Sequence, residues 1–310
     1  MEIIALATAL SVGGLLAVQT SANLQLTRAV GTPYGASALQ LGIAAALLGL
    51  LAAASGTLAA LTALPRADLW MLAGGIASPL YITSGILLFP RLGALASVGL
   101  FVTGQVFASL VLDLGGLIGV PHRPASPGML LGAVAVLAGI TMVIRGQRAR
   151  AGQPGGTRAG RYGWIALGLV AGAVLPVQGA VNAALRTRLG EPLVVGLVSF
   201  TVATLTIAVV LAALLVTGRT GRPRLRPLAA MPWWGWVGGV VAATYVTATF
   251  LLIPAIGAAT TVALTVTGQQ VASAAIDHYG GFRLPSRRLT AARLSGLCTL
   301  VAGSALVQVW

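Results

Sequence analysis

Apolar stretches, separated by short polar or glycine- and proline-containing turns, recur along the whole chain. Most are close to the roughly 20 residues that an α-helix needs to cross about 30 Å of hydrocarbon. The pattern therefore predicts an all-α membrane protein with ten transmembrane helices. The predicted helices lie at about 3–24, 35–61, 68–88, 92–113, 128–144, 164–185, 193–217, 233–252, 255–277 and 290–308.

A polar segment rich in glycine and arginine, residues 145–163, separates the fifth predicted helix from the sixth. We expect it to be a flexible surface linker, because its composition offers no apolar face to bury. It divides the chain into a first unit, residues 1–144, and a second unit, residues 164–310, with five predicted helices each.

Polar motifs of the first unit recur in the second. Gln19 and Asn23, followed by Gly and Pro, return 159 positions later as Gln178 and Asn182. A second motif, Val-Thr-Gly-Gln followed by Ser and Asp at four-residue intervals, begins at Val102 and returns 164 positions later. The chain is therefore an internal duplication, the sequence signature of many transporters.

The shift between the two offsets predicts a five-residue insertion in the second unit. We place it at the arginine-rich segment 219–226, which is longer than its counterpart near Pro65 and Arg66.

An odd number of helices in each unit predicts that the two units are inverted relative to each other in the membrane. The arginines provide an independent check on this topology. With ten helices, fifteen arginines fall on one side of the membrane and four on the other. Because positively charged loops stay in the cytoplasm, this distribution places both termini outside. The four arginines of the outer side are Arg66, Arg123, Arg186 and Arg188.

Composition narrows the class of protein. Of the 310 residues, 57% are hydrophobic and 8% charged, against about 25% charged in ordinary soluble domains. The net charge of +14 comes from arginines in short loops, which excludes a basic nucleic-acid groove. The single Cys298 excludes an internal disulfide and a thiolate metal site. No nucleotide-binding loop or nucleophile motif occurs, so we expect no enzyme activity, cofactor or metal.

Each predicted fourth helix carries three polar residues at four-residue spacing, which places them on one face. Such a stripe must face the protein interior or a water-filled cavity, because lipid cannot satisfy it. It can line a cavity between the units, or it can form interhelical hydrogen bonds worth about 0.6 kcal/mol each. The stripes are Gln105, Ser109 and Asp113 in the first unit, and Gln269, Ser273 and Asp277 in the second.

Asp113 and Asp277 are the only carboxylates near membrane depth. A desolvated carboxylate can exchange protons near neutral pH, which suits proton-coupled transport. Alternatively, each lies at a helix end, where it is solvated, caps a turn or pairs with an arginine. Because Leu114 in the first copy stands opposite His278 in the second, the copies are no longer equivalent. The second copy is the better candidate for proton chemistry.

Other repeated residues suggest two roles each. The amide pairs Gln19 with Asn23 and Gln178 with Asn182 can bind a polar group of a cargo or join helices. Two tyrosines, Tyr81 and Tyr245, can stack on a cargo or pack in the core.

The glycines of the fourth helices point to packing. Gly104 and Gly268, each followed four residues later by alanine, predict close helix approach.

The two repeated signatures, Q-x3-N…G-x-P and V-T-G-Q-x3-S-x3-D, resemble the drug/metabolite transporter (DMT) superfamily, and within it the YdcZ-like branch of bacterial inner-membrane exporters. The resemblance covers nearly the whole chain as two fused five-helix modules. It implies a multi-pass protein of the plasma membrane that exports a small organic metabolite or drug-like solute by alternating access. A non-transporting scaffold or lipid-handling protein is the alternative. The sequence leaves open whether the protein is a homodimer.

Overall fold

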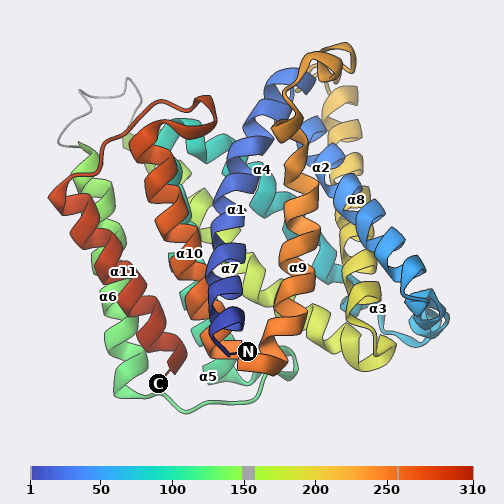
Figure 1. The fold of residues 1–310 in the computed structure, drawn as a ribbon, viewed down its shortest axis with the longest axis horizontal. Coiled ribbons are helices and arrows are strands. Elements are labelled where there is room, and N and C mark those ends of the chain that lie inside the picture. Colours follow the sequence, from blue (N-terminus) through green and yellow to red (C-terminus); the bar gives the residue numbers. More distant parts are fainter. Residues whose placement is uncertain (1, 149–157, 257, 310) are drawn as a thin grey trace.

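A computed structural model describes residues 2–148, 158–256 and 258–309 of the chain, and these form a bundle of helices without strands (Figure 1). The α-helices of the first unit are α1 (Glu2–Val30), α2 (Pro33–Ala54), α3 (Leu69–Leu72), α4 (Ala77–Leu92), α5 (Ala94–Gly115) and α6 (Pro127–Arg148). Those of the second unit are α7 (Arg158–Leu189), α8 (Pro192–Val216), α9 (Val237–Ile256), α10 (Ala258–Tyr279) and α11 (Ala291–Val309). Short 3₁₀ turns are η1 (Thr57–Arg66), η2 (Ala73–Ile76), η3 (Leu117–Gly119), η4 (Arg226–Ala230), η5 (Trp233–Trp236) and η6 (Gly281–Arg283).

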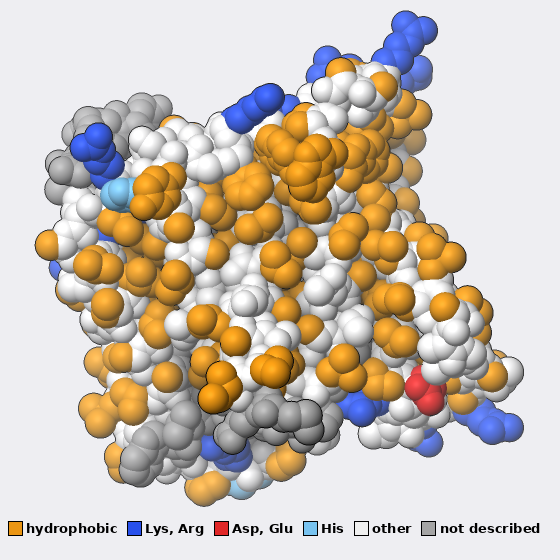
Figure 2. Space-filling view, in the orientation of Figure 1, with side chains coloured by type: hydrophobic (Ala, Val, Ile, Leu, Met, Phe, Trp, Pro, Cys, Tyr) orange, Lys and Arg blue, Asp and Glu red, His pale blue; other side chains and the backbone are white. Residues whose placement is uncertain are grey.

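Seven helical segments in the described part of the chain are long and apolar enough to cross a membrane. They are Ile3–Val30, Pro33–Ala54, Leu69–Leu92, Ala94–Gly115, Pro127–Gly146, Gly160–Leu189 and Pro192–Val216. In Figure 2, hydrophobic side chains cover the middle of the visible face, and arginines gather towards its two ends. This distribution fits a multi-pass protein with its apolar surface in lipid.

Several predicted boundaries differ from the structure, most of all at the end of the second helix and at the linker. The second predicted helix, 35–61, ends early, because α2 stops at Ala54 and Gly56 takes a left-handed conformation with φ of 72°. The Ser55 hydroxyl donates to the Leu51 carbonyl oxygen at 2.8 Å, which satisfies the helix end. At the predicted linker, α6 continues to Arg148 and α7 begins at Arg158, while residues 149–157 lie outside the described residues.

The two units interlock through their helices. α1 packs against α10, and α7, its counterpart in the second unit, packs against α5. α2 packs against α8, and α6 packs against α11. Because each of these pairs joins the two units, neither unit buries its helices alone.

Glycines allow backbone contact where the first helix of one unit crosses the fourth helix of the other. A Cβ atom on Gly104 in α5 would overlap the Leu169 carbonyl oxygen in α7, and one on Gly172 would overlap the Phe101 carbonyl oxygen. The equivalent crossing of α10 with α1 has the same geometry, since Gly268 lies against the backbone of Leu10. The close approach predicted from Gly104 and Gly268 is confirmed.

The contact between α6 and α11 uses glycines seven residues apart on both helices. A Cβ atom on Gly132 would lie 2.7 Å from the Gly303 carbonyl oxygen, and one on Gly139 would lie 2.7 Å from that of Gly296. The absence of these Cβ atoms lets the two backbones approach closely. Dispersion and Cα–H···O contacts can then hold the helices together, because lipid provides no hydrophobic driving force between them.

The turns after α5 and α10 have the same backbone shape. Gly116 and Gly280 have φ of 58° and 67°, and the non-glycine residues Ile118 and Phe282 have φ of 55° and 56°. A positive φ is uncommon in a residue with a branched or bulky side chain. The internal repeat therefore extends from the sequence to the backbone conformation of these turns.

We predict that Gly172→Ala lowers the thermal unfolding midpoint of the detergent-solubilised protein. The added methyl group would press on the Phe101 backbone, and overpacking of this kind costs about 1–3 kcal/mol. Gly179→Ala in the same helix is the matched control, because Gly179 is exposed and a Cβ atom there would have no neighbour within 4 Å. There the change gains helix propensity, so the midpoint should stay level or rise. Equal losses in both variants would contradict the assigned crossing.

Candidate functional site

Amide side chains of the two units occupy equivalent places at the helix crossings. The Asn23 Nδ2 atom donates to Gln40 Oε1 at 3.3 Å, and the Asn182 Nδ2 atom donates to Ser199 Oγ at 3.2 Å. Gln40 and Ser199 are themselves equivalent positions at the offset of 159. The repeat therefore preserves the contact of each asparagine as well as its place in the sequence.

Glycines of the opposite unit receive these asparagines. A Cβ atom on Gly238 would overlap Asn23 Oδ1, and one on Gly74 would overlap Asn182 Oδ1. Both Oδ1 atoms are buried without a hydrogen-bond partner among the described residues. Two buried amide oxygens thus lie where the two units meet, with acceptor capacity left over.

The glutamines of the same helices differ in their contacts. Gln178 donates through Nε2 to Ser78 Oγ at 2.7 Å and to Ser199 Oγ at 3.4 Å, which joins α7 to α4 and α8. Gln19 occupies the equivalent place on α1 and is buried. These contacts support the interhelical role of the amides, and their role towards a cargo stays a prediction.

A tyrosine and a glutamine meet between α4 and α10. The Gln269 Nε2 atom donates to the Tyr81 hydroxyl oxygen at 2.8 Å, and the Tyr81 ring packs on Phe101 with ring centroids 4.8 Å apart. Both members of this pair are buried, whereas their repeat counterparts Gln105 and Tyr245 are half-buried.

The two polar stripes differ in exposure along their whole length. Gln269, Ser273 and Asp277 on α10 are 2%, 0% and 1% exposed. The stripe of α5, which has the same residue types and spacing, is half-buried at each position. The repeat therefore places similar side chains in two different environments, one closed and one partly open. The residues of the α5 stripe are Gln105, Ser109 and Asp113.

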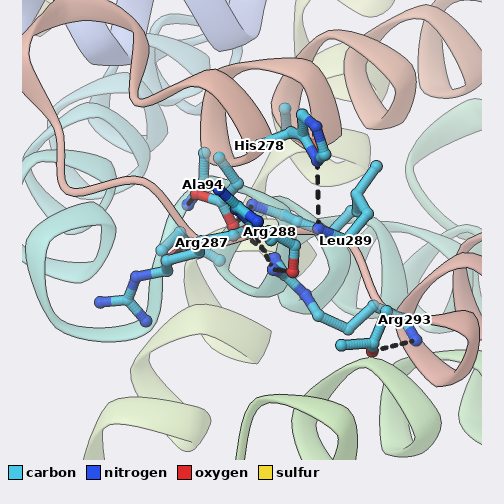
Figure 3. A network of polar contacts seen from close by, with 12 residues as sticks. Ala94, His278, Arg287, Arg288, Leu289 and Arg293 are labelled. Atoms are coloured by element: carbon cyan, nitrogen blue, oxygen red, sulfur yellow. Dashed lines mark hydrogen bonds and ion pairs between the residues drawn. The ribbon is translucent and has the colours of Figure 1, made fainter. Parts of the chain in front are cut away.

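The closed stripe ends in a network of polar contacts that joins α10 and α11 to the start of α5 (Figure 3). Asp277 Oδ2 lies 2.6 Å from the Arg293 guanidinium, and both side chains are almost fully buried. Asp277 Oδ1 also accepts a hydrogen bond from the Ala94 backbone N–H at 2.7 Å, and Oδ2 accepts one from Leu95 at 3.3 Å. The carboxylate therefore caps the N-terminus of α5, where the helix dipole favours a negative charge.

Arginines extend this network to the end of α4. Arg287 donates through Nη2 to the Pro90 carbonyl oxygen at 3.2 Å, and Arg293 donates through Nη1 to the Arg287 carbonyl oxygen at 2.6 Å. Gly93 lies between α4 and α5 with φ of 82°, and a Cβ atom there would lie 2.9 Å from Asp277 Oδ2. The turn between α4 and α5 is thus held against the loop between α10 and α11.

The first unit has no equivalent of this network among its described residues. Asp113 lies 3.9 Å from Arg123, and their side chains are 22% and 40% exposed. Met129, which is buried, stands at the position that corresponds to Arg293. The backbone contact is nevertheless repeated, because Arg123 N–H donates to the Asp113 carbonyl oxygen as Arg287 does to that of Asp277.

The topology argument from the sequence treats Arg293 as one of the fifteen arginines on the cytoplasmic side and assigns it no functional role. The signal was present, because Arg293 falls inside the predicted helix 290–308, and an arginine within a span needs a partner.

Two apolar grooves lie on the outside of the bundle. One of about 530 Å³ runs between α10 and α11 and includes Val271, His278 and Cys298. The other, of about 350 Å³, runs between α2 and α9 and includes Leu47 and Thr247. None of the residues predicted to bind a cargo lines either groove. The described residues contain no group of three or more His, Cys, Asp or Glu side chains that could hold a metal ion.

Comparison with known proteins identifies the family. Residues 4–142 and 163–306 both match the model of the family described as "Putative inner membrane exporter, YdcZ". The chain belongs to the YdcZ family of the drug/metabolite transporter superfamily. Membership makes the protein an inner-membrane transporter of the exporter type rather than an enzyme.

A solved structure supports the fold. It is titled only "Crystal structure of protein" and is 20% identical in sequence, with a TM-score of 0.57. The match covers 96% of this chain and 95% of that one. A search of curated proteins found no match.

We predict that Asp277→Asn destabilises this YdcZ-family protein far more than Asp113→Asn. Removing one partner of a buried ion pair costs about 3–5 kcal/mol, whereas an exposed pair contributes about 0–1 kcal/mol. Unfolding in detergent measures both losses. The double variant Asp277→Asn, Arg293→Met copies the Met129 of the first unit, and it should recover part of the loss because no charge stays buried alone. Equal losses for the two aspartate variants would contradict the assigned network.

Proposed function

We propose that this protein exports a small organic solute by alternating access, using ten transmembrane helices arranged as two inverted five-helix repeats. The observation that carries the proposal is the unequal exposure of the two repeated stripes, one buried on α10 and one half-buried on α5.

The helix arrangement supports the inverted repeat. Besides the seven segments above, α9, α10 and α11 have 20, 22 and 19 residues, which is close to the length that a bilayer requires. The chain reverses direction at each successive long helix in Figure 1. The start of α1 and the end of α11 lie at one end of the bundle, and the end of α6 and the start of α7 lie at the other.

The difference between the stripes supports alternating access. Because the units have similar motifs, each can adopt the conformation now held by the other, as inverted repeats do in known transporters. Such an exchange would expose the α10 stripe and bury the α5 stripe. The Asp277 end of α10 lies at the end of the bundle where α6 ends and α7 begins, which the arginine distribution assigns to the cytoplasm. The present conformation is then closed towards the cytoplasm and partly open towards the outside.

The chemistry of the repeated residues favours a neutral or amphipathic solute. Amides and hydroxyls at the unit interface offer donors and acceptors without fixed charge, and the spare Oδ1 atoms of Asn23 and Asn182 are acceptors. Tyr81, which packs beside Gln269, and its repeat counterpart Tyr245 could offer aromatic faces to such a solute.

Proton coupling is the further part of the proposal. Asp113 is half-buried and can exchange a proton with solvent in the present conformation, while Asp277 is held by Arg293 until the units exchange. The two carboxylates would then take up and release protons on opposite sides in turn.

A non-transporting scaffold is the alternative, and the hydrogen bonds of Gln178 and Gln269 across the units favour it. A scaffold keeps one conformation, so the stripes would keep their present exposure. The accessibility of Ser109 and Ser273 to a water-soluble reagent therefore distinguishes a transporter from a scaffold.

We predict that Ser273→Cys, in a Cys298→Ser background, becomes reactive towards a membrane-impermeant maleimide only from the cytoplasmic side. Ser109→Cys should react from the outer side, because the α5 stripe is partly open there. Ser304→Cys on α11 is the control, since Ser304 is as buried as Ser273 but lies outside the stripes. Labelling of each variant in right-side-out and in inverted vesicles measures its reactivity from the outer and from the cytoplasmic side. A Ser273→Cys variant that stays as unreactive as the control would support the scaffold.

We also predict solute-dependent proton flux in proteoliposomes. A thermal-shift screen of small organic solutes identifies the cargo first, because a bound cargo stabilises the folded state in proportion to its concentration over Kd. Asp113→Asn with Asp277→Asn should abolish the proton flux. Solute transport that continues unchanged in the double variant would overturn proton coupling and leave alternating access standing.

A further inference from the structure

The connection between α8 and α9 carries four arginines in eight residues, 219–226, which we name the arginine loop. All four are exposed, and the loop projects from the end of the bundle where α8 ends, as the blue side chains at the top right of Figure 2 show. The arginines are Arg219, Arg222, Arg224 and Arg226.

The arginine loop is held in place by contacts at its base. The Arg224 backbone N–H donates to the Val30 carbonyl oxygen at 2.9 Å, and the Thr220 and Thr32 hydroxyl oxygens lie 3.1 Å apart. The Arg224 guanidinium packs on Gly31, just beyond the C-terminal end of α1. The remaining three guanidinium groups are therefore presented to solvent from a fixed backbone.

No carboxylate compensates this charge among the described residues. The chain has five acidic residues, and the ion pairs of the described residues join Asp113 to Arg123 and Asp277 to Arg293. Asp277 is the acidic residue near this end of the bundle, and Arg293 neutralises it. The arginine loop therefore forms a region of positive potential that attracts anions from outside the protein.

Apolar side chains border the arginine loop. Val216, Leu225 and Trp233 are 88%, 69% and 78% exposed, in the last turn of α8, within the loop and at the start of η5. Exposed tryptophan beside arginine is typical of the boundary between hydrocarbon and lipid headgroups. The cationic and apolar groups thus match the two parts of a phospholipid.

We propose that the arginine loop binds the anionic phospholipid headgroups of the leaflet on its side of the membrane. Arg219, Arg222 and Arg226 contact the phosphates, and Leu225 and Trp233 lie at the level of the first acyl carbons. A basic side chain near an anionic leaflet contributes about a fivefold factor in affinity, so three contribute about a hundredfold. This inference depends on the membrane location alone and not on the cargo or on alternating access.

The two units differ at this place. The corresponding connection of the first unit has Arg66 and Asp68 where the second unit has the four arginines of the arginine loop. We therefore expect this lipid binding only at the second unit and only in the leaflet that the arginine loop faces.

The test measures the thermal unfolding midpoint of delipidated protein in neutral detergent as phosphatidylglycerol or phosphatidylcholine is added. The loop variant carries Arg219→Gln, Arg222→Gln and Arg226→Gln. The control variant carries Arg66→Gln, Arg186→Gln and Arg188→Gln, which removes the same charge from exposed arginines of the other end. Arg224 is kept in both, because its guanidinium packs on Gly31.

We expect phosphatidylglycerol to raise the midpoint of the native protein and of the control variant more than phosphatidylcholine does. The loop variant should need about a hundredfold more phosphatidylglycerol for the same rise. The difference should shrink as salt screens the charges. Equal responses in the loop and control variants would overturn the proposal, as would an equal rise with inorganic phosphate in place of lipid.

Discussion

The close crossing of the first helix of each unit with the fourth helix of the other is the contact on which the structure depends. In lipid no hydrophobic effect draws helices together, so association rests on dispersion and polar contacts at short range. Glycine at 104, 172 and 268 brings the backbones into direct contact. Polar side chains next to these crossings pair with other helices of the opposite unit, as Gln269 on α10 does with Tyr81 on α4. Polar residues that lipid cannot satisfy are thereby paired across the duplication.

The duplication gives two similar units, yet substitutions at their ends make them differ, and the exchange of Met129 for Arg293 has the largest effect on charge. Arg293 occupies the position of Met129, and it neutralises a buried carboxylate that also caps α5. Asp113, the first-unit counterpart of Asp277, has only a partly exposed contact with Arg123. Nearly the same backbone turn follows both carboxylates, so the difference arises from side chains and not from the fold. A shared scaffold therefore supports a tight closure at one end and a looser one at the other.

Much of this architecture could be predicted from the sequence, because apolar length fixes where helices cross a membrane and repeated motifs show the duplication. The close approach at Gly104 followed from small residues on one face. The sequence places Arg293 inside a predicted helix and so indicates that it needs a partner, but not that the partner is Asp277, because the two residues are sixteen positions apart and meet only where α11 folds back on α10. The end of α2 was also not predicted, because the apolar pattern continues past Gly56, where the helix has already ended. The unequal exposure of the α5 and α10 stripes could not be predicted either, because both have the same residue types and spacing and differ only in how the surrounding helices pack.

The inequality of the two ends has an energetic consequence in the proposed cycle. If opening of the arginine-rich end separates Asp277 from Arg293 or from the α5 N-terminus, a buried charge is left without its partner, which is costly unless water enters. Closing the opposite end brings Asp113 against a unit that offers Met129 instead of a second arginine. In the proposed cycle the two conformations would therefore differ in free energy, and the one closed at the arginine-rich end would be favoured without cargo. A cargo would then have to bind the other conformation more tightly by about that difference in order to make it the more populated one.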